Sequence, residues 1–169
     1  MKLRDCQIAF IVIGLLFPNV LAAQTLSKAD ENAIRAIVIA VPEALDHKDM
    51  KAYAELFADD ADWINVVGMH WTGKAAVVKA HAVYLKTVFR DGGMSTGDMS
   101  IRAVTPDVAI VVVTEINNGG GILPDGSKAP PGSGRLTYVL VKRDGNWKIT
   151  HGHNTSIDPK AQPFDPINQ

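Results

Sequence analysis

Cysteine is nearly absent from this sequence of 169 residues. The single cysteine, Cys6, lies inside the first 23 residues, so residues 24–169 contain none. Disulfide bonds, thiolate metal sites and a cysteine nucleophile are therefore excluded for that part of the chain. A domain formed by residues 24–169 must be held together by its hydrophobic core alone.

A surplus of either charge is also missing. The 17 Lys and Arg residues are balanced by 18 Asp and Glu residues, which leaves no basic footprint for nucleic acid or for an anionic membrane. Nucleotide motifs are missing as well, because Gly119-Gly120-Gly121 leads to a proline and not to a helix. We therefore expect no nucleic-acid partner and no cofactor.

The first 23 residues have the three regions of a secretory signal peptide. Lys2 and Arg4 precede a short apolar run over residues 8–17, and small residues suited to cleavage follow Pro18. An uncleaved anchor is the alternative, but the run is too short for a comfortable membrane span. We expect cleavage, a periplasmic or secreted protein with no membrane association, and a single domain over residues 24–169.

Apolar spacing predicts three helices, followed by strands. The helices run from Ser27 to about Leu45 with a kink at Pro42, from Asp49 to about Phe57, and from Gly73 to Asp91. Strands are expected at Trp63–Val67, Met99–Val104, Val108–Asn118, Gly134–Lys142 and Trp147–Ser156. A loop rich in glycine and proline over residues 119–132 is either a lid or a plain hairpin excursion. This order is an α+β pattern, with helices on one face of a curved, mainly antiparallel sheet.

Four local phrases carry a resemblance to a known family. They are Leu56–Ala61, Trp71–Ala76 with His81 following, Thr105–Val111, and Asp144–Ile149. Together they resemble the nuclear-transport-factor-2-like (SnoaL-like) superfamily of conical α+β folds, and within it the SgcJ/EcaC-type branch. The resemblance implies a pocket between the helices and the concave sheet, and a homodimer through the opposite sheet face. It does not specify function, because this fold hosts isomerases, cyclases, dehydratases and plain ligand binders.

Ketosteroid isomerisation, the best understood chemistry on this fold, is disfavoured here. It needs a strand carboxylate as the base and a tyrosine as an oxyanion donor. Short alignments place Asn65 at the position of the base and Val41 at the position of the tyrosine. An amide does not accept a proton at working pH, and valine cannot donate a hydrogen bond.

A polar set around the expected pocket supplies the candidate site. His81 lies on the apolar stripe of the third predicted helix, and alternation along residues 147–155 places His151 and His153 on the same face as Trp147 and Ile149. The catalytic candidates are His81, His151, His153 and Asn65, and the substrate-binding candidates are Trp63, Tyr84, Glu115, Asn117 and Arg135.

Each candidate has a structural alternative. His81 would also suit a core histidine bonded to a neighbour, and a strand end in solvent would give the same pattern as the His151/His153 pair. Glu115 shares a face with Val111 and Val113, where burial would raise its pKa, but the opposite, dimer-side face is the alternative. His-x-His on a strand is compatible with zinc, yet the other ligands are scattered, so we expect no metal site.

Two functions follow from these residues. In the first, the protein is a cofactor-independent enzyme of the isomerase or lyase type, with a histidine as acid or base and Asn65 or Arg135 orienting the carbonyl of a small apolar substrate. In the second, it is a non-catalytic ligand-binding or accessory module, and its histidines only satisfy one another and the ligand.

Overall fold

Three helices lie on one face of a six-stranded sheet in this protein. The computed structural model describes residues 25–91 and 93–167, so the predicted signal segment lies outside the described residues. The helices are α1 (Lys28–Asp46), α2 (Met50–Glu55) and α3 (Lys74–Tyr84), and a short 3-10 turn, η1 (Gln162–Phe164), follows the sheet. The strands are β1 (Phe57–Ile64), β2 (His70–Thr72), β3 (Met94–Thr105), β4 (Val108–Asn117), β5 (Gly132–Arg143) and β6 (Asn146–Ser156).

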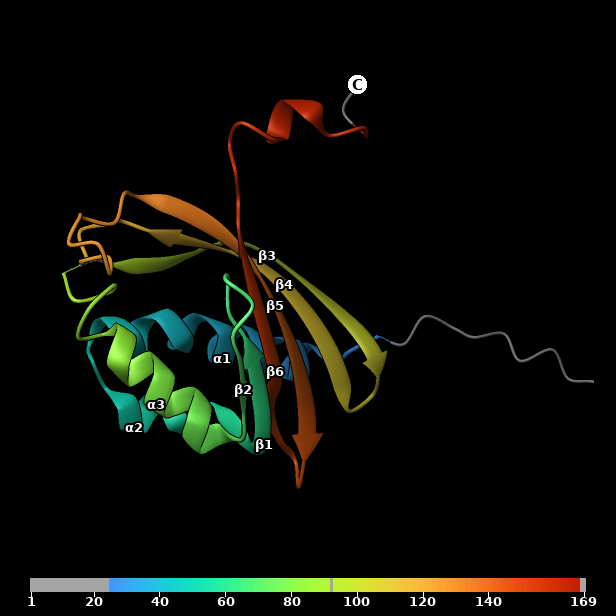
Figure 1. The fold of residues 1–169 in the computed structure, drawn as a ribbon. Helices are drawn as coiled ribbons and strands as arrows, with labels where there is room; N and C mark the ends of the chain where they lie inside the picture. The colour runs from blue at the N-terminus through green and yellow to red at the C-terminus, as the bar shows by residue number, and fades with distance from the viewer. Residues whose placement is uncertain (1–24, 92, 168–169) are drawn as a thin grey trace, which may run out of the picture.

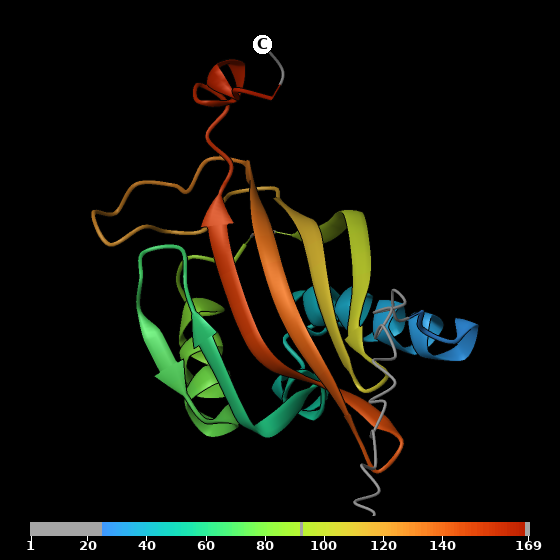
Figure 2. The same ribbon diagram turned by 90° about the vertical axis from the view of Figure 1, so that its right-hand side faces the viewer.

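The sheet is antiparallel except for one central pair. Its strand order is β2-β1-β6-β5-β4-β3, and only β1 and β6 run parallel. Figures 1 and 2 show the long strands curving around the helices, which all lie on the concave side. The predicted conical α+β fold, with helices on a curved and mainly antiparallel sheet, is confirmed. Among the described helices, none is long and apolar enough to cross a membrane.

The start of α1 is joined to the sheet by one carboxylate. Ser27 caps the helix by accepting from the Asp30 amide at 3.0 Å. Asp30 Oδ1 in turn accepts from Lys142 Nζ at 2.7 Å and from Trp147 Nε1 at 2.8 Å. The hydrogen bond from Lys142 is the main reason that the pKa of Asp30 falls to about 2. The helix then continues through Pro42 to Asp46.

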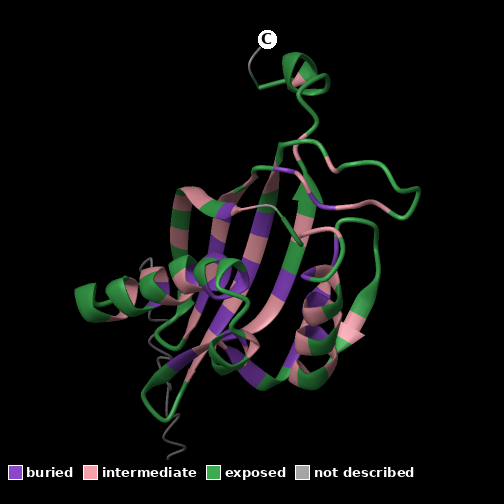
Figure 3. Ribbon diagram, turned by 90° about the vertical axis from the view of Figure 1, so that its left-hand side faces the viewer, coloured by how far each residue is buried: buried purple, intermediate pink, exposed green. Residues whose placement is uncertain are grey.

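The core fills the space between the helices and the concave face. Buried positions alternate along β4 and β5, and in Figure 3 they form a band on the side that the helices cover. Ile34, Val38 and Val41 of α1 pack there against inward-facing side chains such as Leu140 and Ile149. Core side chains fill the space between α1 and the sheet on the side of β3, whereas a cavity remains between the sheet and α3.

Several segments differ from the prediction, among them β3, which begins at Met94 and not at Met99. The second helix ends at Glu55, and β1 begins at Phe57, where a helix was expected. The reason is tertiary: the Ile149 amide donates to the Leu56 carbonyl at 2.9 Å, so β6 draws this segment into the sheet. The short strand β2, which pairs with β1, was not predicted, and α3 ends at Tyr84 and not at Asp91.

A β-bulge in β6 changes which side chains face the core: after the bulge, each residue points to the face opposite to the one that simple alternation predicts. Ile149 pairs with Leu140 and His151 with Val139, so Thr150 is an extra residue between them. As a result Trp147 and Ile149 face the core, but from Gly152 onward the even-numbered residues face inward. The predicted single face from Trp147 to His153 is therefore wrong.

Candidate functional site

A cavity of about 310 Å³ lies between α3, β1 and the concave ends of β4–β6. Most of its wall is apolar, with Val41, Leu45, Trp71, Phe89 and Leu136 among the contributors. The polar side chains in the wall are few: Tyr53, Asn65, His81, Tyr84, Glu115 and Asn154. A mainly apolar hollow with a few polar groups is the usual form of a small-molecule site.

His81 comes from the inner face of α3 and is surrounded by aromatic rings. Its ring centroid lies 4.8 Å from Trp63 and 5.1 Å from Tyr53. Burial lowers the pKa of His81 from 6.5 to about 4, so the imidazole is neutral at pH 7. Nδ1 lies 2.9 Å from the Val77 carbonyl and must carry the proton to donate there, which leaves Nε2 as an acceptor. His81 is thus a cavity residue and a weak base.

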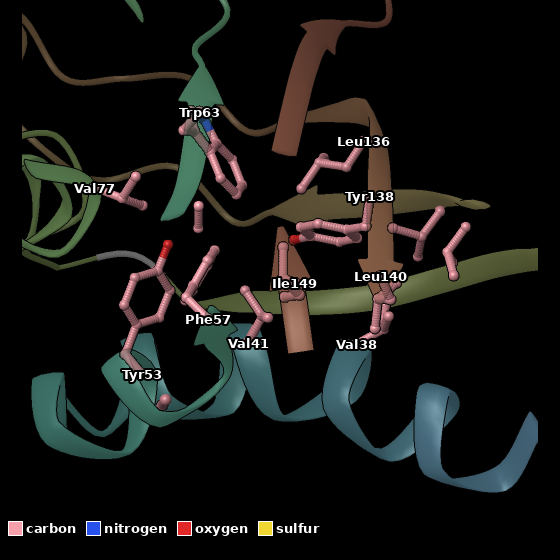
Figure 4. Close-up of a cluster of buried hydrophobic side chains, with 14 of the residues drawn as sticks. Val38, Val41, Tyr53, Phe57, Trp63, Val77, Leu136, Tyr138, Leu140 and Ile149 are labelled. Carbon is pink, nitrogen blue, oxygen red and sulfur yellow. The ribbon is translucent and has the colours of Figure 1, made fainter. Parts of the chain in front are cut away.

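Tyr53, on α2, is fully buried and its hydroxyl has no hydrogen-bond partner among the described residues. Figure 4 shows the side chain leaving α2 with its hydroxyl directed toward Val77 and Trp63. An unpaired buried hydroxyl costs roughly 1–3 kcal/mol. Burial also raises the pKa of Tyr53, so the hydroxyl keeps its proton. Tyr53 is among the residues that line the cavity, so the wall holds a hydrogen-bond donor that has no protein acceptor in the described structure.

Glu115 enters the cavity from β4, one step beyond the buried Val113. Its pKa is raised from 4.5 to about 7, first by burial and then by the nearby negative charge of Asp46. Asp46 itself is held by the Met94 amide, which donates to its Oδ1 at 2.9 Å. Glu115 therefore exchanges its proton near neutral pH, which suits a general acid or base.

The side-chain amide of Asn65 is hydrogen-bonded to two backbone amides and to one neighbouring side chain. Its Oδ1 accepts from the amides of Val67 and Met69 at 3.1 and 2.8 Å, and its Nδ2 donates to Tyr84 Oη at 3.2 Å. These contacts hold the turn between β1 and β2. Asn65 therefore lines the cavity with its polar atoms already occupied, and Tyr84 closes that side of the wall.

The two strand histidines do not face the cavity. The bulge turns His151 outward, where its Nδ1 contacts Asp62 Oδ1 at 2.7 Å. His70 Nε2 contacts the other oxygen of Asp62 at 2.8 Å. His153 follows two residues later on the same outer side and is exposed. The structure does not bring His151 and His153 together with His81.

Arg135 also lies on the outer face, where it donates to Thr114 Oγ1 at 2.7 Å. The sequence-based expectation that it orients a substrate carbonyl is therefore not compatible with its position. Asn117 does lie on the inner side of β4 with Glu115, as predicted, but it borders a neighbouring cleft and not the cavity itself. No group of three or more His, Cys, Asp or Glu side chains within the described ranges is placed to hold a metal ion.

The loop after β4 closes one side of the cavity through Leu123 and Pro124. It folds as a small hairpin in which the Gly120 amide donates to Ala129 and the Ala129 amide donates to Gly121. A Cβ atom at Gly121 would overlap the Val88 carbonyl, so only glycine allows this close approach to the segment after α3.

Two functional candidates were missed in the sequence. Tyr53 was not among the candidates, although a buried tyrosine hydroxyl normally needs a partner, which is a reason to consider any tyrosine on an apolar helix face. Simple alternation from Trp147 puts Asn154 on the opposite face, away from the core, but in the structure it lines the cavity and accepts from Trp63 Nε1 at 3.1 Å. Nothing in the local sequence indicates the bulge that turns Asn154 inward.

Comparison with known proteins agrees with this architecture. The family model described as a SnoaL-like domain matches residues 34–158. The chain belongs to the SnoaL-like family. No curated protein sequence matches it. Among solved structures, an uncharacterised protein with a cystatin-like fold from Caulobacter vibrioides is 38% identical, with a TM-score of 0.77, over 82% of this chain and 96% of that one.

Other solved structures of similar fold carry names of enzymes. A protein from Novosphingobium aromaticivorans that is named as a candidate scytalone dehydratase is 21% identical, with a TM-score of 0.64, over 77% of this chain and 85% of that one. The hexachlorocyclohexane dehydrochlorinase LinA, in its type 2 form, is 18% identical, with a TM-score of 0.68, over 77% and 86%. At these identities the likeness shows a shared fold alone.

Proposed function

We propose that this SnoaL-like protein binds a small, uncharged and largely apolar molecule in its cavity and transfers a proton on it without a cofactor. The supporting observation is that Glu115 and Tyr53 line one apolar cavity, the first with a pKa of about 7 and the second with an unpaired hydroxyl. The signal segment predicted for residues 1–23 would place this activity in the periplasm or outside the cell.

The charge state of the cavity supports an uncharged ligand. Between pH 4 and pH 7 Glu115 is mostly protonated and His81 is mostly neutral, since their pKa values are about 7 and about 4. Neither group then offers an ionic partner, and a charged molecule would lose its hydration without compensation. Names of neighbours such as dehydratase and dehydrochlorinase agree with a neutral substrate that loses a proton.

The proposed reaction is of the isomerase or lyase type. The Glu115 carboxylate removes a proton from the carbon next to a carbonyl, and the C–H electron pair moves into the enolate. Tyr53 donates a hydrogen bond to the enolate oxygen, where the negative charge collects. The proton then returns at another carbon, or a leaving group departs with its electron pair. His81 Nε2 accepts a hydrogen bond from the substrate and takes no proton at neutral pH.

A non-catalytic binding module is the second candidate. It is favoured by the internal use of the polar atoms of Asn65 and by the low pKa of His81, because both residues then serve the architecture of the wall. The two functions share the same ligand site and differ only in whether Glu115 transfers a proton.

Binding in the cavity is tested by filling it. Leu136, on β5, lines the cavity, and Leu136→Trp is expected to weaken the binding of 2-naphthol at pH 6 at least about tenfold, because the larger ring occupies the space of the ligand. Isothermal titration calorimetry gives the affinity. The control is Thr137→Trp, on the same strand but the opposite face, which should bind like the wild type. Equal binding by both variants would show that the ligand lies elsewhere.

The outer face of the sheet is proposed as a homodimer interface. No helix within the described ranges covers this face (Figure 2), and Val139 and Ile110 form a half-buried apolar pair on it. Val139→Lys is expected to convert a dimer into a monomer, because two lysines would meet near the two-fold axis of such a dimer. Light scattering after size exclusion measures the mass, with the exposed loop variant Ser127→Lys as the control. A wild-type protein that is monomeric at high concentration would refute the interface.

A further inference from the structure

A second hollow adjoins the cavity and has a different chemistry. This outer cleft, of about 890 Å³, lies between the ends of β4, β5 and β6 and the chain that follows β6. Besides Glu115, the polar residues that line it are Asn117, Asn118, Ser133, Asn154, Thr155, Ser156 and Gln162. The cleft and the cavity share six lining residues: Val66, Val88, Phe89, Glu115, Leu136 and Asn154. The two hollows therefore meet at Glu115.

The outer cleft offers hydrogen-bond donors but no positive charge. Asn117 Oδ1 accepts from the Gly119 amide at 2.7 Å, and Asn154 Oδ1 accepts from Trp63 Nε1 at 3.1 Å. These bonds fix the orientation of both amides and leave each Nδ2 group without a protein acceptor in the described part of the chain. Glu115 is the only ionisable side chain among the described residues that line the cleft.

These features select a class of molecule. Amides and hydroxyls without a counter-charge pair well with neutral hydroxyl groups and poorly with a phosphate or sulfate, which would stay unpaired next to the carboxyl of Glu115. The cavity, in contrast, is walled by aromatic and aliphatic side chains and suits a ring system. One molecule that spans both would place the junction between its two parts beside Glu115.

We propose that the ligand of this protein has two parts: an apolar ring system that fills the cavity, and an uncharged, hydroxyl-rich group of the sugar type that lies in the outer cleft. This inference rests on the proposed function, since it extends the same site and names the class of its substrate. A carbon at the junction of the two parts is then the place where the Glu115 carboxylate removes a proton.

Three matched probes test the proposal by calorimetry at pH 6: 2-naphthol, 2-naphthyl β-D-glucoside and 2-naphthyl sulfate. We expect the wild-type protein to bind the glucoside at least about fivefold more tightly than 2-naphthol, from the net gain of one or two hydrogen bonds. The sulfate should bind more weakly than either. Asn117→Asp keeps the acceptor for the Gly119 amide but removes the Nδ2 donor, and should reduce the preference for the glucoside to less than about twofold without changing the affinity for 2-naphthol.

Controls separate this proposal from the proposed function. Asn146→Asp makes the same change in charge at the β5–β6 turn, far from the cleft, and should keep the preference. Ser156→Ala removes a hydroxyl from the cleft on the side of Asn154, should also reduce the preference for the glucoside, and serves as a second variant should Asn117→Asp fold poorly. If 2-naphthol binds but the glucoside binds no better, the two-part ligand is wrong and the cavity site stands. If neither binds, both proposals fail, and tighter binding of the sulfate would mean an anion site instead.

Discussion

Glu115→Gln is expected to reduce the rate of proton exchange next to the carbonyl of 2-tetralone at least about 100-fold, because an amide cannot replace a carboxylate as the general base. 2-Tetralone is a neutral, bicyclic ketone of the kind that the cavity should accept. Exchange of its α-protons in deuterated water is followed by proton NMR, with the uncatalysed rate subtracted. The exposed residue Glu43 provides the matched control, and Glu43→Gln should exchange like the wild type.

The pH dependence of this exchange has a definite sign. The active form is the Glu115 carboxylate, whose fraction grows as the pH rises through a pKa of about 7. The rate should therefore rise between pH 6 and pH 8 and then level off. His81 stays neutral across this range, because its pKa is about 4, so it adds no second step. A rate that has already levelled off below pH 6 would point to a base other than Glu115.

Tyr53→Phe separates the two roles in the reaction. The loss of the donor should reduce the exchange rate about 100-fold and leave the pH midpoint in place. The same change should stabilise the free protein by about 1 kcal/mol, because it removes an unpaired buried hydroxyl. If 2-tetralone binds but no variant changes its exchange, the protein is the non-catalytic binding module.

The stability of Glu115→Gln gives an independent measure of the same pKa. Between pH 4.5 and about 7 the folded protein keeps the Glu115 proton while the unfolded chain loses it, so wild-type stability falls as the pH rises through that window. The shift corresponds to about 3 kcal/mol. Urea denaturation should show that Glu115→Gln gains about this much over the wild type from pH 4 to pH 8. His81 contributes equally to both proteins, and Glu43→Gln should show no such pH-dependent gain.

Most of the fold could be predicted because its signals are local. The apolar spacing of Ile34, Val38 and Val41 belongs to one helix, and the alternation of Val111 and Val113 belongs to one strand. The first strand was placed too late because Leu56 and Phe57 fit the helix that precedes them. Their true partner is β6, about 90 residues further along the chain, and pairing over that distance leaves no mark on the local pattern.

The candidate site was harder to predict than the fold, for a geometric reason. Glu115 and Asn117 lie on one face of β4 with Val111 and Val113, as predicted, because β4 alternates without interruption from Ala109, but alternation did not decide whether that face lines the cavity. In β6 a single extra residue, Thr150, exchanges the two faces, so His153 moves out and Asn154 moves in. Alternation has a period of two, and one inserted residue therefore inverts every later assignment. Tyr53 was missed for another reason: its ring packs in the core, and the spacing of apolar residues does not show that its hydroxyl lacks a partner.

The inverted half of β6 also contains the position least able to accept a side chain. Gly152 faces inward against the indole of Trp63, and a Cβ atom there would overlap three atoms of the ring. Gly152→Ala is therefore expected to destabilise the protein by about 3 kcal/mol or more, as measured by urea denaturation. Gly132→Ala, at a strand position with open space around it, should change the stability by less than about 0.5 kcal/mol.

A double-mutant cycle shows whether the indole is the cause. Trp63→Leu alone should cost about 3 kcal/mol, because a large buried ring is lost from the core. In the Trp63→Leu background, Gly152→Ala should cost about 1 kcal/mol, since the methyl group then enters the space that the ring has left. Additive costs would mean that Gly152 is required by the backbone of the bulge and not by Trp63. Non-additive costs would show that this wall of the cavity depends on the contact between Gly152 of the bulged strand and the Trp63 indole. The same indole donates to Asn154 and so positions its amide between the cavity and the outer cleft.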